Sequence, residues 1–184
     1  MLLWGDGMSV DIKGKNSIRI LCYVALLSAT ALVLSVFENM LPPLPFVLPG
    51  MKLGISNLAV MVSLEICPLP CAFGIVLVKG FFALLTRGAT AFCMSVAGGL
   101  LATLGMYLLL KQNVLKFGCL GVGVWGAFLH NCGQLLVAYI LVSDAVFVYF
   151  PLLCCASVVT GGMTGLVYHI VLPYVYKVPL LGKL

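Results

Sequence analysis

Apolar residues follow one another in six runs, which short clusters of proline, glycine and charged residues interrupt. The runs cover residues 18–37, 53–66, 70–85, 89–110, 119–142 and 145–172. A helix needs about 20 apolar residues to cross a bilayer, so the second and third runs are short. The pattern predicts an all-α integral membrane protein, a six-transmembrane-helix bundle at residues 18–174, with short tails at residues 1–17 and 175–184.

Composition supports the membrane assignment independently. Hydrophobic residues make up 63% of the 184 positions and charged residues only 8%, with a mean hydropathy of +1.22. Soluble domains carry roughly 25% charged residues, so this chain could not cover its surface in water. The first run is too long for a cleaved signal peptide, and we expect it to stay in the membrane. Met8 is an alternative start to Met1.

Basic residues segregate to one face if the chain crosses the membrane six times. Five or seven crossings would scatter the same charges over both faces. The positive-inside rule makes the basic face cytoplasmic. We therefore expect a multi-pass protein of the cell membrane with both termini in the cytoplasm. The basic residues on the face that holds both termini are Lys13, Lys15, Arg19, Lys111, Lys116, Lys177 and Lys183.

The fifth run carries polar groups near its centre. At 100° per residue, His130, Asn131 and Gln134 fall on the same side of the predicted helix as Gly126 and Ala127. Hydrocarbon offers no hydrogen bonds, so these groups must face a protein partner or a cavity. Two readings stay open: a solute pocket, and hydrogen bonds that hold neighbouring helices together.

Polar residues of other runs gather in the same, outer half of the predicted bundle. Lys79 lies about two turns inside the third run. Inserting a lysine into the membrane at such a depth costs on the order of 2.5–3.5 kcal/mol of free energy. Lys52 and Arg87 could extend to lipid headgroups, and Lys79 could pair structurally with Glu38 or Glu65. Convergence on one half favours a pocket for a small solute. The candidate substrate-binding residues are Glu38, Asn39, Lys52, Asn57, Lys79, Arg87, His130, Asn131 and Gln134.

Small residues line one face of three predicted helices. On the first, Ala25, Ser28 and Ala29 form a strip that either packs inside the bundle or docks another membrane subunit. Two further stripes are interpreted as packing surfaces, because small side chains let helix backbones approach closely. These are Ser95, Gly98, Gly99 and Ala102 on the fourth run, and Ser157, Gly161, Thr164 and Gly165 on the sixth.

Several chemistries find no support in the sequence. The eight cysteines do not follow zinc or redox spacing, and His130 and His169 lie on different predicted helices. Phosphate-loop, dinucleotide and nucleophile-elbow motifs are missing. We expect no catalytic residue, cofactor, metal or nucleic acid; the expected partners are a small solute and the lipid bilayer.

Three strings resemble a known family: PGMKLGISN at residues 49–57, SVAGG at 95–99 and GAFLHNCGQ at 126–134. Together they resemble the Gx transporter family, also labelled heptaprenyl diphosphate synthase component I. That family is similar to the substrate-binding S components of energy-coupling-factor (ECF) transporters. The resemblance implies an S-component-like six-helix fold and docking through Ala25 and Ala29, which match an AxxxA pattern. It also implies a coupling membrane subunit and an ATPase pair as partners, and it supplies no substrate.

The synthase label leads to a separate expectation about the motifs that a prenyl synthase would carry. Prenyl chain elongation needs paired aspartate-rich motifs that hold magnesium on a diphosphate. This chain has only Asp6, Asp11 and Asp144, and none lies in a DDxxD arrangement. We therefore expect a non-enzymatic S component of an ECF-type importer. The alternative is a non-transport accessory subunit in isoprenoid, quinone or flavin-linked extracellular electron-transfer metabolism.

Overall fold

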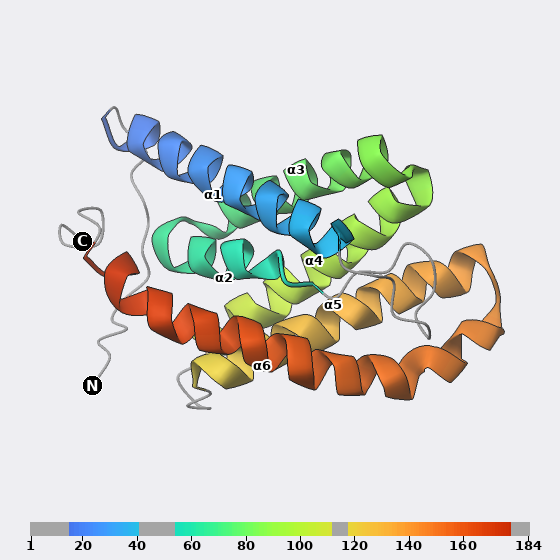
Figure 1. The fold of residues 1–184 in the computed structure, drawn as a ribbon. Helices are drawn as coiled ribbons and strands as arrows, with labels where there is room; N and C mark the ends of the chain where they lie inside the picture. The colour runs from blue at the N-terminus through green and yellow to red at the C-terminus, as the bar shows by residue number, and fades with distance from the viewer. Residues whose placement is uncertain (1–14, 41–53, 112–117, 178–184) are drawn as a thin grey trace.

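The computed structural model describes residues 15–40, 54–111 and 118–177, and all of the regular structure in these ranges is helical (Figure 1). The prediction of an all-α protein is therefore confirmed. The elements are α1 (Lys15–Met40), α2 (Asn57–Ile66), α3 (Leu69–Arg87), α4 (Ala89–Lys111), α5 (Cys119–Leu141), the 3-10 helix η1 (Asp144–Tyr149) and α6 (Phe150–Val175).

Five helical segments are long and apolar enough to cross a membrane: α1, α3, α4, α5 and the continuous stretch of η1 and α6. The chain is thus a multi-pass membrane protein. The sixth helix, α2, has only 10 residues, or about 15 Å at 1.5 Å per residue, half of a bilayer core of about 30 Å. The expectation of six full crossings therefore stays a prediction.

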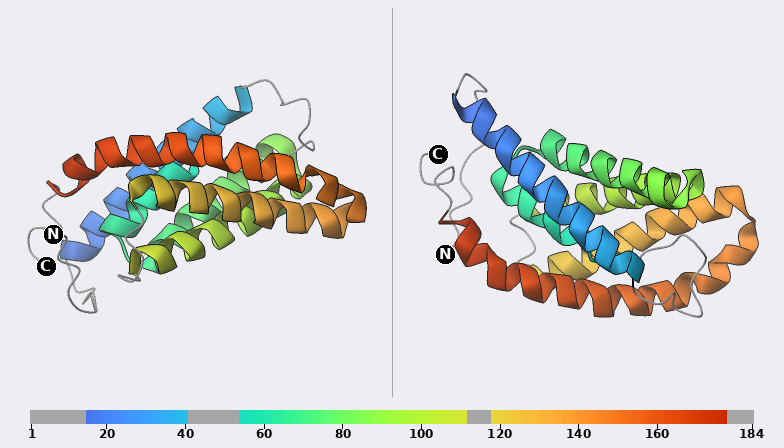
Figure 2. Two further views of the ribbon diagram at one scale, coloured as in Figure 1. Left: turned by 90° about the horizontal axis from the view of Figure 1, so that it is seen from below. Right: turned by 45° about the horizontal axis from the view of Figure 1, so that its top comes forward.

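The long helices run up and down along a shared direction. The first turn of α1 and the last turn of α6 lie at the same end of the bundle in all three views (Figures 1 and 2). This arrangement agrees with an even number of crossings. The membrane face on which that end lies stays a prediction.

The short helix α2 lies in the middle of the bundle and contacts all five other α-helices. Its residues Ala59, Val60, Met61 and Val62 are buried and form the centre of the main apolar core. Before it, Gly54 adopts a φ of 86°, a left-handed conformation that glycine takes without strain. The chain turns there, and the helix begins at Asn57 instead of continuing from the apolar residues before it.

The predicted sixth run is not one helix. Residues Asp144–Tyr149 form a 3-10 turn, and α6 starts at Phe150 with Pro151 in its first turn. Proline suits that position because the first backbone N–H groups of a helix have no partner within it. The tight turn lets α6 pack back against α5. Among the described helices, α5 and α6 share the most extensive contact.

Glycines bring the backbones of α4, α5 and α6 together. A Cβ atom on Gly123 would lie 2.3 Å from the carbonyl oxygen of Gly161, and one on Gly133 would lie 2.7 Å from Cα of Gly98. A Cβ on Gly165 would lie 2.7 Å from the carbonyl oxygen of Cys119. No larger residue fits these contacts, so the interpretation of the small-residue stripes on α4 and α6 as packing surfaces is confirmed.

Candidate functional site

The end of α1 meets the start of α2 through a buried carboxylate. Oε1 of Glu38 accepts hydrogen bonds from the backbone N–H groups of Gly54 and Ile55, the latter at 3.2 Å. These N–H groups precede the first turn of α2, where the helix dipole favours a negative charge. Glu38 therefore holds the turn that precedes α2 from a different helix.

A buried lysine joins the same place from α3. Nζ of Lys79 donates a hydrogen bond of 2.8 Å to Oδ1 of Asn57, the first residue of α2. Only 4% of Lys79 and 6% of Asn57 is exposed. The carboxamide oxygen stabilises the ammonium group inside the bundle, and the pair links α3 to the start of α2.

His130 of α5 lies against the turn at Gly54. A Cβ on Gly54 would be 3.2 Å from Cδ2 of the imidazole, and a Cβ on Gly98 of α4 would be 2.9 Å from Nδ1. The two glycines leave just enough space for the ring, which is buried. His130 is therefore held between α4 and the start of α2.

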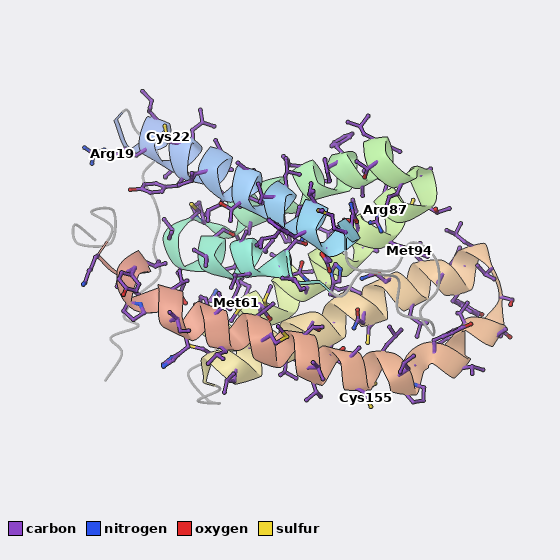
Figure 3. All side chains as sticks on the ribbon, viewed as in Figure 1. Arg19, Cys22, Met61, Arg87, Met94 and Cys155 are labelled. Atoms are coloured by element: carbon purple, nitrogen blue, oxygen red, sulfur yellow. The ribbon has the colours of Figure 1, made fainter. Side chains whose placement is uncertain are left out.

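Arg87, the last residue of α3, completes the group. It is half-buried, and it lies within electrostatic range of Glu38. In Figure 3 its side chain lies beside the C-terminal end of α1, where Glu38 is located. We call Glu38, Asn57, Lys79, Arg87 and His130 the polar cluster; its members come from α1, α2, α3 and α5.

Within the polar cluster, Oε2 of Glu38 and Nδ2 of Asn57 are buried without a hydrogen-bond partner among the described residues. A cavity of about 10 Å³ borders Asn57, enough for one water molecule. This cavity has no room for a molecule larger than water. It lies between Gly54, Asn57 and Met61 on one side and Gly123, Gly126 and Ala127 of α5 on the other.

All five residues of the polar cluster lie within the part of the chain that matches a known protein family. The family model described as heptaprenyl diphosphate synthase component I matches residues 27–171. The chain belongs to this family. No curated protein and no solved structure matches the chain. The family resemblance drawn from the sequence is thereby confirmed.

Five of the nine predicted binding residues of this family member meet in the polar cluster. Gln134 is buried one helical turn beyond His130 on α5. Lys52 lies outside the described residues. Asn39 is exposed near the end of α1, so its side chain does not join the buried group that its neighbour Glu38 enters. One residue along a helix is a rotation of about 100°, which explains the difference.

Asn131 contacts the neighbouring helix α6. Its Nδ2 donates to Oγ of Ser157 at 2.8 Å and to the carbonyl oxygen of Leu153 at 3.3 Å, both on α6. Asn131 therefore bridges α5 and α6, and it does not line the cavity beside Asn57. Of the two readings left open for the polar groups of α5, these bonds favour interhelical bonding for Asn131.

Glu65, the other carboxylate weighed as a partner of Lys79, lies at the opposite end of α2. It accepts hydrogen bonds from the hydroxyl groups of Tyr168 at 2.5 Å and Tyr176 at 3.4 Å. Burial, and secondly the charge of Glu65, raise the pKa of Tyr176 to about 12, so this hydroxyl stays protonated and can donate. Sequence reasoning missed this contact because the three residues share no motif or spacing.

The small residues of α1 divide between two faces. Ala25 and Ala29 are exposed, whereas Ser28 is buried. Ile18 and Val33 are exposed on the same side of the helix as the two alanines. Of the two alternatives for this strip, internal packing therefore does not apply to Ala25 and Ala29, and Ser28 does not belong to the exposed strip.

Proposed function

We propose that this family member binds a small solute from the outer side of the membrane, as the S component of an ECF-type importer. The observation that carries the proposal is the polar cluster at the start of α2. Ionisable residues inside membrane segments are costly, and they typically mark the sites of substrates and ions. A cluster that draws Glu38, Lys79, Arg87 and His130 from three helices is hard to explain by packing alone.

The position of α2 supports the same conclusion. In many transporters, the ends of short or interrupted helices lie near the middle of the membrane and face the substrate. Here a helix of 10 residues starts inside the bundle, and its first turn carries Asn57 of the cluster. Oε2 of Glu38 and Nδ2 of Asn57 are buried without a partner among the described residues, and a solute or an ordered water would satisfy them.

The exposed strip on α1 supports a partner for transport. Ala25 and Ala29 present a shallow surface where another helix can approach closely. In this proposal the strip docks the coupling membrane subunit, and an ATPase pair from other chains supplies the energy. The protein itself binds and releases solute and catalyses no reaction.

A second function has one observation in its favour, the family description that names a prenyl diphosphate synthase component. In that case the chain would be a membrane accessory to an enzyme of isoprenoid, quinone or flavin-linked electron-transfer metabolism. The polar cluster would then have a structural role, or it would hold a group that the enzyme presents.

Purification of the tagged protein from its native membrane separates the two functions. The importer proposal predicts that an ATPase pair and one further membrane subunit copurify in fixed stoichiometry and dissociate when Ala29 is changed to Trp. Copurification of a prenyl or redox enzyme, with no ATPase, would contradict the importer proposal and support the accessory role.

A further inference from the structure

We infer that Glu38 is an internal anion that occupies the place of a carboxylate or phosphate group of the solute, and that solute binding displaces it from the start of α2. This inference rests on the proposed function and names the chemical class of the solute. It assigns Glu38 the role of a competitor for the anion site rather than that of a ligand.

The surroundings of Glu38 are rich in donors and positive charge. Its Oε1 accepts from the N–H groups of Gly54 and Ile55, in the turn just before the positive end of α2. Lys79 and Arg87 belong to the same cluster, which therefore holds two cations and one anion. Backbone N–H groups at a helix start together with basic side chains form a common binding site for anions.

Asn57 provides an independent sign that a ligand belongs here. Its Nδ2 is buried without a hydrogen-bond partner among the described residues, although its Oδ1 is bonded to Lys79. The ideal Cβ position on Gly54 lies 3.1 Å from this Nδ2, so the carboxamide is folded back over the turn that carries the donor N–H groups. This donor thus lies beside the turn whose N–H groups bind the carboxylate, within the same buried group.

Glu38 satisfies this site incompletely. One of its carboxylate oxygens is bonded, but Oε2 is buried without a partner among the described residues. An unpaired buried polar atom carries a desolvation cost that is recovered when the group returns to water. Glu38 is two residues from the end of α1, next to the exposed Asn39. The carboxylate is therefore both incompletely held and close to an exit.

The size of the cavity favours exchange over addition. With about 10 Å³ beside Asn57, an anionic group cannot enter while every side chain stays in place. Departure of the Glu38 carboxylate would leave a space that fits another anionic group in size and shape, surrounded by donors and positive charge. The incoming anion would inherit the Gly54 and Ile55 N–H groups and gain Nδ2 of Asn57.

Benzoate and benzamide form a matched pair of probes, because they differ mainly in charge at the same group. Their binding to the purified full chain in detergent is measured by calorimetry for the wild-type protein, for Glu38→Gln and for Glu65→Gln. The last is the control, since Glu65 is bonded to tyrosines at the other end of α2.

Removal of the internal anion in Glu38→Gln should tighten benzoate binding at least tenfold and leave benzamide binding unchanged. Glu65→Gln should bind both probes with the affinity of the wild-type protein. Adding Lys79→Met to Glu38→Gln should reverse the gain. If Glu38→Gln does not fold, Glu38→Asp keeps the charge but shortens the reach to the two N–H groups, and it should show a smaller gain of the same sign.

Unchanged or weaker benzoate binding in the Glu38 variants, or no benzoate binding to any of the proteins, would overturn the inference. Phosphatidylglycerol should not compete with benzoate, and competition would assign the anion to a lipid headgroup instead of a solute. These outcomes do not depend on the coupling partners, so the inference can fail while copurification with an ATPase pair still supports the importer.

Discussion

At the scale of single residues, neighbours on one helix have separate roles. His130 enters the polar cluster, whereas Asn131, rotated by about 100° on α5, bonds to α6. Glu38 and Asn39 divide in the same way between the cluster and the surface. Sequence reasoning grouped these residues correctly by depth. It could not separate them by direction, because a wide polar face is compatible with either neighbouring helix.

The bridge from Asn131 to α6 makes a prediction about stability. Asn131→Leu keeps a similar volume but removes the bonds to Ser157 and Leu153. Interhelical hydrogen bonds in membranes contribute about 0.6 kcal/mol on average, so we expect a loss of that order in the free energy of unfolding. Affinity for the solute should stay within a factor of about two, because this side chain does not touch the cluster.

Thermal or denaturant unfolding in detergent, with and without solute, measures both quantities. Ser157→Ala is the matched control, since it removes the partner of the same bond; the double variant should lose less than the sum of the two single losses. A large loss of affinity in Asn131→Leu with unchanged stability would return Asn131 to the binding site.

At the scale of elements, most helix positions could be predicted from the sequence. Prolines and glycines mark where the long apolar runs end, and α3, α4 and α5 begin and end within two residues of the predicted limits. The late start of α2 was missed because it depends on the turn at Gly54 and on the hydrogen bond from this turn to Glu38, a contact between distant parts of the chain. The 3-10 turn before α6 was missed because Ala145 to Tyr149 is as apolar as the helix that follows.

The exposed strip of α1 makes the prediction at this scale. Ala29→Trp places a large side chain where Ala25 and Ala29 otherwise leave a flat surface. We expect it to block assembly with the coupling subunit while the protein stays folded and binds solute, because Ala29 is exposed in the single chain. Copurification and the melting temperature measure the two effects.

Two tryptophan variants serve as controls for Ala29→Trp. Val159→Trp adds bulk to the exposed face of α6 and should leave assembly intact. Ala31→Trp adds it at a fully buried position of α1 and should destabilise the fold itself. If Ala29→Trp lowers the melting temperature as much as Ala31→Trp does, the strip is an internal packing surface.

At the scale of the whole molecule, the two ends of the bundle hold different elements. The start of α1 and the end of α6 share one end, and the turn between α5 and η1 lies at the other (Figure 1). The positive-inside rule assigns the shared end to the cytoplasm. The polar cluster would then lie in the outer half of the bundle, as capture of an external solute requires.

Cysteine labelling of intact cells tests this orientation. Gly5→Cys and Gly182→Cys, both outside the described residues, should not react with a membrane-impermeant maleimide above the background of the native cysteines. Ser143→Cys, at an exposed position of the opposite turn, should react. Labelling of either terminal variant from outside the cell would invert the topology and place the binding site on the wrong face.

The central claim is that the polar cluster binds a small solute, and the molecule retained by gently purified protein tests it most directly. Native mass spectrometry should detect one small molecule in the wild-type protein. Lys79→Met, which removes a buried charge of the cluster without removing much volume, should lose it while the protein stays folded. If the wild-type protein and Lys79→Met carry the same molecules in the same amounts, or if neither retains any, the assignment of the cluster as a solute-binding site is wrong.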